Sequence, residues 1–237
     1  MLVRLGLVAV AVVACKGEEK HVIKAAAPPP VMQDAATPKP ADEWADARFE
    51  MVERTVAARG ITDKSVLAAL KITPRHEFVP PDIRYRAYDD SPLPIGFDLT
   101  ISQPFIVATM TQAAKVKPGD HVLEIGTGSG YQAAVLALMG AKVWTMEIHP
   151  ELAKRTQLVL QKLGYKNVQM KTGDGYFGWQ DGAPYDAILI TCATPEIPPP
   201  LIAQLKTGGR IVAPVGDIEQ FMYVYTKNAS GTLDRDG

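Results

Sequence analysis

The chain has 237 residues, of which 47% are hydrophobic and 22% charged, so it contains enough apolar material for one full core. Its formal net charge of −1 offers no electrostatic basis for binding nucleic acid or an anionic membrane surface. The two cysteines, Cys15 and Cys192, lie far apart, so we expect neither a disulfide framework nor a metal site.

Residues 1–15 have the pattern of a targeting segment. Arg4 precedes an apolar run, 5–14, of about ten residues, which is the length of a signal-peptide core and too short to span a bilayer. The run ends in Val12-Val13-Ala14-Cys15, which resembles a bacterial lipobox, in which the cysteine carries the lipid. We therefore expect a lipid anchor at Cys15 and a periplasmic place in the cell envelope. The alternatives are a short buried element with a chance cysteine, and a cytoplasmic protein with a mistranslated leader.

Residues 16–40 form a linker. The segment contains Pro28-Pro29-Pro30, Pro38 and Pro40 within alanine-rich sequence, and it has almost nothing to bury. Branched and aromatic residues recur from Asp42 onward without a second linker, so we expect one domain over 41–237.

The first part of this domain is predicted to be helical. A helix over 43–59 ends at Gly60, and Asp63 can cap a second helix that reaches Leu70. Prolines then favour an irregular segment to about residue 103, followed by a helix over 105–115 with Pro104 near its first turn.

Strands and helices alternate after residue 120. Strands are predicted at 121–125, 143–147, 168–172, 186–191, 210–214 and 221–226, and helices at 131–139, 150–163 and 198–206. This alternation predicts an α/β, doubly wound, Rossmann-like fold, with a mainly parallel sheet, helices on both faces and an N-terminal helical extension.

A glycine loop follows the first of these strands and opens a helix. Such a loop forms a ligand cradle at the carboxyl end of a parallel sheet. The glycines fall at 126, 128 and 130, whereas the third glycine of the dinucleotide pattern would fall at Tyr131. Glu124, two residues before the first glycine, would repel a pyrophosphate but suits a cationic ligand with an amino-acid end group. S-adenosylmethionine fits that description.

Two further acids end the next strands. Glu147 can accept hydrogen bonds from both ribose hydroxyls, and Asp174, in Gly173-Asp174-Gly175, can accept from the adenine amino group. Each acid alone is typical of a solvated loop. Three of them at successive strand ends, beside a glycine cradle, favour a nucleoside site.

The chain closely resembles the protein-L-isoaspartate O-methyltransferase family from about residue 66 to 227. The matching blocks are Arg75-His76-Glu77-Phe78-Val79-Pro80, Tyr88 to Gly96, Thr100-Ile101-Ser102-Gln103-Pro104, Val122 to Ala137, Gly173-Asp174-Gly175, Pro195-Glu196-Ile197-Pro198, and Gly208-Gly209-Arg210 through Pro214-Val215-Gly216. The glycine loop indicates only a class-I methyltransferase, while the Pro-Leu-Pro-Ile-Gly and Thr-Ile-Ser-Gln-Pro blocks are far more specific.

The resemblance implies methyl transfer from S-adenosylmethionine to the α-carboxylate of L-isoaspartyl residues in damaged proteins, which initiates their repair. It makes Ser102 the active-site residue, with its hydroxyl oriented toward the acceptor carboxylate. The alternative role of Ser102 is to cap the helix that starts near Pro104. The residues expected to contact the cofactor are Thr100, Ile101, Glu124, Gly126, Thr127, Gly128, Gly130, Glu147, Ile148, Asp174, Gly175 and Gln220. We expect a monomer.

The sequence departs from the family pattern in two places. Asp98 and Leu99 replace a glycine and a glutamine before the active-site block, and Asp98 has to adopt a positive φ. The family also continues past a turn like 228–231 into a final strand, which we expect to be missing here. The altered loop leaves open a methyltransferase that acts on another carboxylate or a small molecule, and a tethered cofactor-binding protein without turnover.

Overall fold

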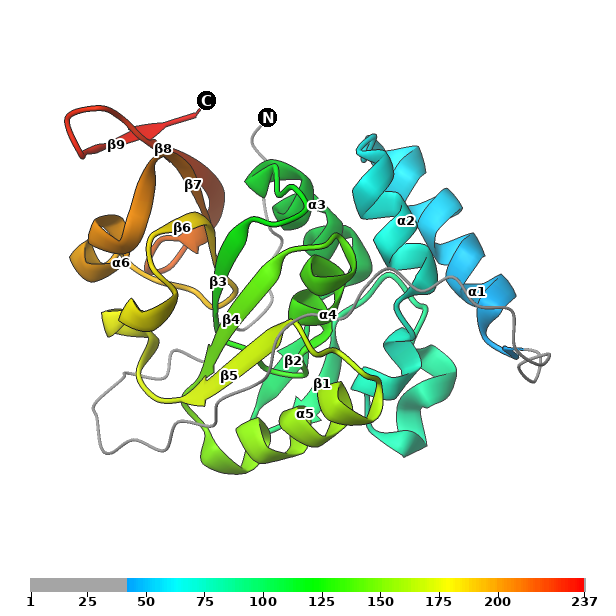
Figure 1. Cartoon of the computed structure of the whole chain (residues 1–237). Coiled ribbons are helices and arrows are strands. Elements are labelled where there is room, and N and C mark those ends of the chain that lie inside the picture. Colours follow the sequence, from blue (N-terminus) through cyan, green and yellow to red (C-terminus); the bar gives the residue numbers. More distant parts are fainter. Residues whose placement is uncertain (1–41, 237) are drawn as a thin grey trace.

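The computed structural model describes residues 42–236, so the targeting segment and the linker lie outside the described residues. Figure 1 shows a twisted sheet with helices packed against it and an additional helical layer formed by the first part of the domain. Within the described range, no helix combines the length and the apolar composition needed to cross a membrane.

The main sheet has seven strands in the order β5-β4-β3-β6-β7-β8-β9. The first five in this order are parallel, and the last two pair antiparallel at one edge. Their bounds are β3 His121–Ile125, β4 Lys142–Glu147, β5 Val168–Thr172, β6 Tyr185–Ile190, β7 Leu205–Val215, β8 Phe221–Lys227 and β9 Leu233–Arg235. The predicted doubly wound, mainly parallel sheet is confirmed.

The helices cover the two faces of the sheet unequally. Their bounds are α1 Ala45–Glu50, α2 Lys64–Ile72, α3 Pro104–Ala114, α4 Tyr131–Leu138, α5 Pro150–Lys162 and α6 Pro199–Gln204. One face packs against α3, α4 and α5, with α1 and α2 outside them, whereas α6 and the segment around Trp179 cover the other. Side chains alternate along β3, so Val122 faces the α3–α5 side while Leu123 and Ile125 face the α6 side. By the same alternation, Glu124 points toward α3 and α4.

The helix predicted over 43–59 has the expected extent but changes geometry along its length. After α1, residues Met51–Val56 form a π-helix and Ala57–Arg59 a 3-10 turn, and Gly60 ends the helix with a φ of +96°. Asp63 caps α2 as predicted, because its side chain accepts hydrogen bonds from the backbone N–H groups of Ser65 and Val66.

A two-stranded hairpin lies within the segment that was predicted to be irregular. It consists of β1 (Leu93–Gly96) and β2 (Leu99–Ile101), which pair antiparallel around the two residues Phe97 and Asp98. The prolines at 92 and 94 obscured this hairpin in the sequence, because proline argues against strands.

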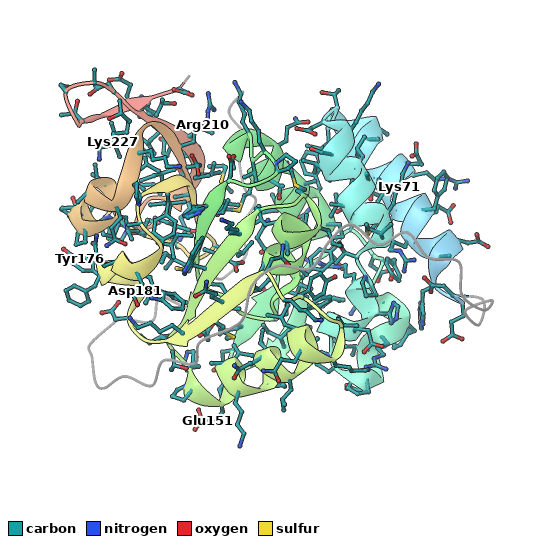
Figure 2. The ribbon with its side chains drawn as sticks, viewed as in Figure 1. Lys71, Glu151, Tyr176, Asp181, Arg210 and Lys227 are labelled. Atoms are coloured by element: carbon teal, nitrogen blue, oxygen red, sulfur yellow. The ribbon has the colours of Figure 1, made fainter. Side chains whose placement is uncertain are left out.

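A strand follows the turn after β8, where none was expected, and the absence of the family's final strand stays a prediction. After the turn at 228–232, β9 pairs with β8 over three residues. Arg210 donates to the carbonyl of Ala113 on α3 and pairs with Asp236 at 3.1 Å, so this edge is tied to the rest of the fold. Lys227, labelled in Figure 2 beside α6, donates to the carbonyls of Ile202 and Leu205.

Candidate functional site

A cavity of about 50 Å³ lies where the glycine loop, β2 and α3 meet at the carboxyl ends of the central strands. It is lined by Thr100, Ile101, Ser102, Val107, Met110, Glu124, Gly126, Thr127, Gly128, Ser129, Tyr131, Gln132 and Thr191. A volume of this size suits one end of a cofactor rather than a whole nucleoside. The cavity therefore has room for only part of the expected cofactor.

The glycine loop has a backbone shape that other residues cannot adopt without strain. Gly126 and Gly130 have φ values of +95° and +87°. A Cβ on Gly126 would lie 2.8 Å from the Thr191 hydroxyl oxygen, and one on Gly130 would lie 2.7 Å from a methyl carbon of Thr156. Gly126 lines the cavity, whereas Gly130 caps α4 and permits its close approach to α5.

Glu124 is completely buried, with one carboxylate oxygen bound and the other free. Its Oε2 accepts a 2.5 Å hydrogen bond from the Thr145 hydroxyl, while its Oε1 is buried without a partner among the described residues. Burial raises the pKa of the Glu124 carboxyl to about 8, the Glu147 carboxylate adds to the rise, and the Thr145 hydroxyl opposes it. An unpartnered buried carboxylate oxygen that lines a cavity is suited to bind a cationic donor.

Glu147 bridges β4 to the glycine loop. Its Oε2 accepts a 2.8 Å hydrogen bond from the Gly128 backbone N–H, and its Oε1 accepts one of 3.0 Å from the His149 backbone N–H. Only 4% of Glu147 is exposed, and Ile148 follows it directly at the strand end. Neither Glu147 nor Ile148 lines the cavity. The contacts predicted between these two residues and the nucleoside would therefore lie outside it.

Asp174, Gly175 and Gln220 also lie outside the cavity lining. Asp174 accepts a hydrogen bond from the Tyr176 N–H and so caps a short 3-10 turn. Gly175 packs so tightly that a Cβ would lie 2.3 Å from a side-chain carbon of Ile125. Gln220 is half-buried in the connection between β7 and β8.

Ser102 lines the cavity and lies between β2 and α3, directly after Ile101. Its backbone carbonyl accepts a 2.7 Å hydrogen bond from Arg75, a fully buried guanidinium that also donates to the carbonyl of Ala87. The Arg75 guanidinium stacks over the ring of Tyr131, 4.7 Å from its centroid. Arg75 thus connects the Ser102 backbone to the start of the helix that follows the glycine loop.

Ser102 does not cap α3. The N-cap residue is Gln103, and the carboxylate of Asp90 accepts a 3.1 Å hydrogen bond from the Phe105 N–H. Asp90 also accepts from Arg59 and from the Gln103 side chain. The cap comes from a residue distant in the sequence, which leaves the Ser102 side chain to the cavity wall.

The hairpin before Ser102 has an unusual turn. Phe97 and Asp98 have φ values of +57° and +56°, so the positive φ expected at Asp98 is confirmed and extends to its neighbour. Two positive φ values in a two-residue loop are typical of a type I′ turn, which normally favours asparagine and glycine. The Phe97 ring stacks on His149 at 5.5 Å, and Arg155 donates to the Ile95 carbonyl, so the hairpin is fastened to the start of α5.

The cavity brings together seven of the thirteen predicted site residues. These are Thr100, Ile101, Ser102, Glu124, Gly126, Thr127 and Gly128. Sequence patterns provided no reason to select Val107 and Met110 on α3, Gln132 on α4, or Thr191 after β6. The only indication in the sequence that Gln132 belongs to the site is its position two residues after Gly130, the last glycine of the loop.

Comparisons with known proteins point to one family. A family model described as protein-L-isoaspartate(D-aspartate) O-methyltransferase matches residues 47–236. The protein-L-isoaspartate O-methyltransferases of Gloeobacter violaceus and Opitutus terrae are 54% and 53% identical to this chain over 187 and 182 residues. The alignments cover 78% and 76% of this chain and 91% and 78% of those proteins.

Two solved structures share the fold. One, named protein-L-isoaspartate O-methyltransferase, has a TM-score of 0.70 and 28% identity, and the match covers 81% of this chain and 64% of that chain. The other, a Plasmodium falciparum protein described as a beta-aspartate methyltransferase in complex with S-adenosyl-L-homocysteine, has a TM-score of 0.69 and 22% identity. That match covers 80% of this chain and 94% of the other.

Proposed function

This chain belongs to the protein-L-isoaspartate(D-aspartate) O-methyltransferase family, and from that premise we propose how its residues carry out the reaction. The protein is an S-adenosylmethionine-dependent enzyme that methylates the α-carboxylate of L-isoaspartyl residues in damaged proteins or peptides. The observation that carries the assignment of residues is the single cavity that both Glu124 and Ser102 line, beside the glycine loop.

The cofactor end of the site fits S-adenosylmethionine. When bound, the cofactor supplies an activated methyl group on a sulfonium. Glu124, with its buried and unpartnered carboxylate oxygen, would bind the methionine ammonium, and the glycine loop from Gly126 to Gly128 would contact the cofactor. Glu147 and Asp174, at the ends of the next two strands, are the proposed ribose and adenine contacts. Ile148, Gly175 and Gln220 remain proposed contacts from the family resemblance.

The acceptor end requires little acid–base chemistry, because a carboxylate is already a nucleophile at neutral pH. The chain must align the carboxylate with the methyl group and exclude water. In this proposal the Ser102 hydroxyl donates its hydrogen to the acceptor carboxylate; Thr100 and Ile101, on β2, line the same cavity. Arg75 holds the Ser102 carbonyl and so keeps this segment in place.

The test is methyl transfer from labelled S-adenosylmethionine to matched isoaspartyl and aspartyl peptides. We expect labelling of the isoaspartyl peptide alone, and a loss of about tenfold or more in kcat/KM for Ser102→Ala, because an orienting hydrogen bond to a charged group is removed. Ser230→Ala, in an exposed turn remote from the cavity, is the control. Equal rates for Ser102→Ala and the control would contradict the role of Ser102.

The Phe97–Asp98 turn is the observation that supports an alternative substrate. If S-adenosyl-L-homocysteine binds but neither peptide is labelled, the chain acts on another carboxylate or a small molecule, or binds the cofactor without turnover. Labelled small carboxylates in the same assay distinguish these outcomes.

We further propose that the protein is a monomer with one catalytic domain over 41–237, held to the cell envelope by a lipid on Cys15. This proposal rests on the sequence of residues 1–40, and the alternative is a cytoplasmic protein. Mass spectrometry of the mature N-terminus tests it, with Cys15→Ser as the control. An unmodified chain that fractionates with the cytoplasm would refute it.

A further inference from the structure

We propose that Gln132 is a further cofactor-binding residue, whose side-chain oxygen accepts a hydrogen bond from the methionine ammonium next to Glu124. The inference rests on the proposed function, because it concerns the same cofactor site. Gln132 lies in the first turn of α4, lines the cavity and is only 7% exposed.

The neighbouring helix fixes the orientation of the Gln132 amide. Thr111 on α3 donates its hydroxyl hydrogen to the Val107 carbonyl at 2.7 Å. A threonine hydroxyl has one hydrogen, so Thr111 can only accept from Gln132. The Gln132 amide nitrogen, which lies 2.8 Å from the Thr111 oxygen, is therefore the donor of that bond. Reversing the amide would require the Thr111 hydroxyl to turn its hydrogen from the Val107 carbonyl to the Gln132 oxygen.

With the amide in this orientation, its other end is an acceptor. Gln132 Oε1 is buried and has no hydrogen-bond partner among residues 42–236. A buried carbonyl oxygen without a partner costs free energy, which a ligand with N–H groups can recover. A carboxylate cannot bind there, since it has no hydrogen to donate.

Glu124, which lines the same cavity, is arranged in the same way. Its Oε2 is bound by the Thr145 hydroxyl and its Oε1 is free. Glu124 and Gln132 thus line the same cavity, and each is hydrogen-bonded to a threonine through one terminal atom while its Oε1 has no partner among the described residues. Once Glu124 is ionised, its negative charge and one neutral acceptor match a primary ammonium, which carries one positive charge and three hydrogens.

Calorimetric binding of two probes tests the inference. S-adenosyl-L-homocysteine carries the ammonium, and its deamino analogue lacks only that group. We expect Gln132→Met to weaken binding of S-adenosyl-L-homocysteine by about tenfold or more and to change binding of the deamino analogue by less than about twofold. Thr111→Val, which frees the Gln132 amide to rotate, should weaken binding of S-adenosyl-L-homocysteine by a smaller factor. It too should leave binding of the deamino analogue nearly unchanged.

A purely structural Gln132 would weaken both probes equally, and that result would overturn the inference. Thermal unfolding of each variant shows that it is folded before its affinity is measured. Methyl transfer by the wild type separates the two proposals. If the wild type binds S-adenosyl-L-homocysteine but methylates no isoaspartyl peptide, only the proposed function is contradicted. If Gln132→Met keeps the wild-type ratio of affinities for S-adenosyl-L-homocysteine and its deamino analogue, only the role of Gln132 is contradicted.

Discussion

Replacing Glu124 by glutamine should have opposite effects on stability and on cofactor binding. Glu124 is fully buried, and its carboxyl has a pKa of about 8 against an ordinary value of 4.5, chiefly because of desolvation. Between these two pH values the folded chain keeps a proton that the unfolded chain has released. The free energy of unfolding therefore falls as pH rises, by at most about 1.4 kcal/mol per pH unit from this one group.

The magnitude follows from the size of the pKa shift. From 4.5 to about 8 is 3.5 pH units, so the ionised Glu124 destabilises the ligand-free protein above pH 8 by at most about 5 kcal/mol. Glutamine has the same shape and does not titrate. We therefore expect Glu124→Gln to be more stable than the wild type at pH 9, by a few kcal/mol, and to show little difference at pH 5.

Cofactor binding should respond in the other direction. The ammonium of S-adenosyl-L-homocysteine favours the ionised Glu124 carboxyl, so binding should release the proton from Glu124. The affinity of the wild type should therefore rise from pH 6 to pH 8. The glutamine variant should bind at least tenfold more weakly at pH 8 and show a flatter pH dependence.

The assay is urea unfolding at pH 5, 7 and 9, together with calorimetry in two buffers of different ionisation enthalpy. Glu151→Gln serves as the control, because Glu151 is exposed at the start of α5 (Figure 2). Parallel pH profiles of unfolding for wild type and Glu124→Gln, or binding without proton release, would refute the reasoning.

Two further predictions concern the supports of the active-site segment. Phe97→Asn with Asp98→Gly supplies the residues that a type I′ turn favours, and should raise the free energy of unfolding by about 1 kcal/mol in urea; a loss would mean that the Phe97–His149 stack outweighs the backbone strain. Arg75→Lys keeps the buried charge but loses one of the two hydrogen bonds that Arg75 donates to backbone carbonyls, so it should lower the free energy of unfolding by about 2–3 kcal/mol. It should also lower kcat more than the control Arg86→Lys, which changes only an exposed ion pair with Asp89. Unchanged stability and kcat in Arg75→Lys would show that Arg75 does not position Ser102.

The positions of several predicted residues in the fold follow from local sequence. Glu124 and the glycine loop form one continuous segment, and the alternation of β3 determines on which side of the sheet Glu124 points. Glu147 could be placed because the carboxyl ends of parallel strands share one edge of the sheet. Asp63 caps α2 through bonds to residues two and three positions later.

The features that were missed depend on contacts between segments distant in the sequence. Asp90 caps α3 from fifteen residues away, and the orientation of Gln132 depends on Thr111 on another helix. The β1–β2 hairpin was missed because Phe97 and Asp98 are not typical of the turn that they form. Local periodicity carries no information about such pairings.

The measurement that tests the central claim most directly is mass spectrometry of an isoaspartyl peptide after incubation with the wild-type protein and S-adenosylmethionine. We predict a methyl ester on the α-carboxylate, its conversion to a succinimide and the return of part of the peptide to the aspartyl form, with the aspartyl peptide left unmodified. An unmodified isoaspartyl peptide, with a protein that binds S-adenosyl-L-homocysteine, would contradict the account.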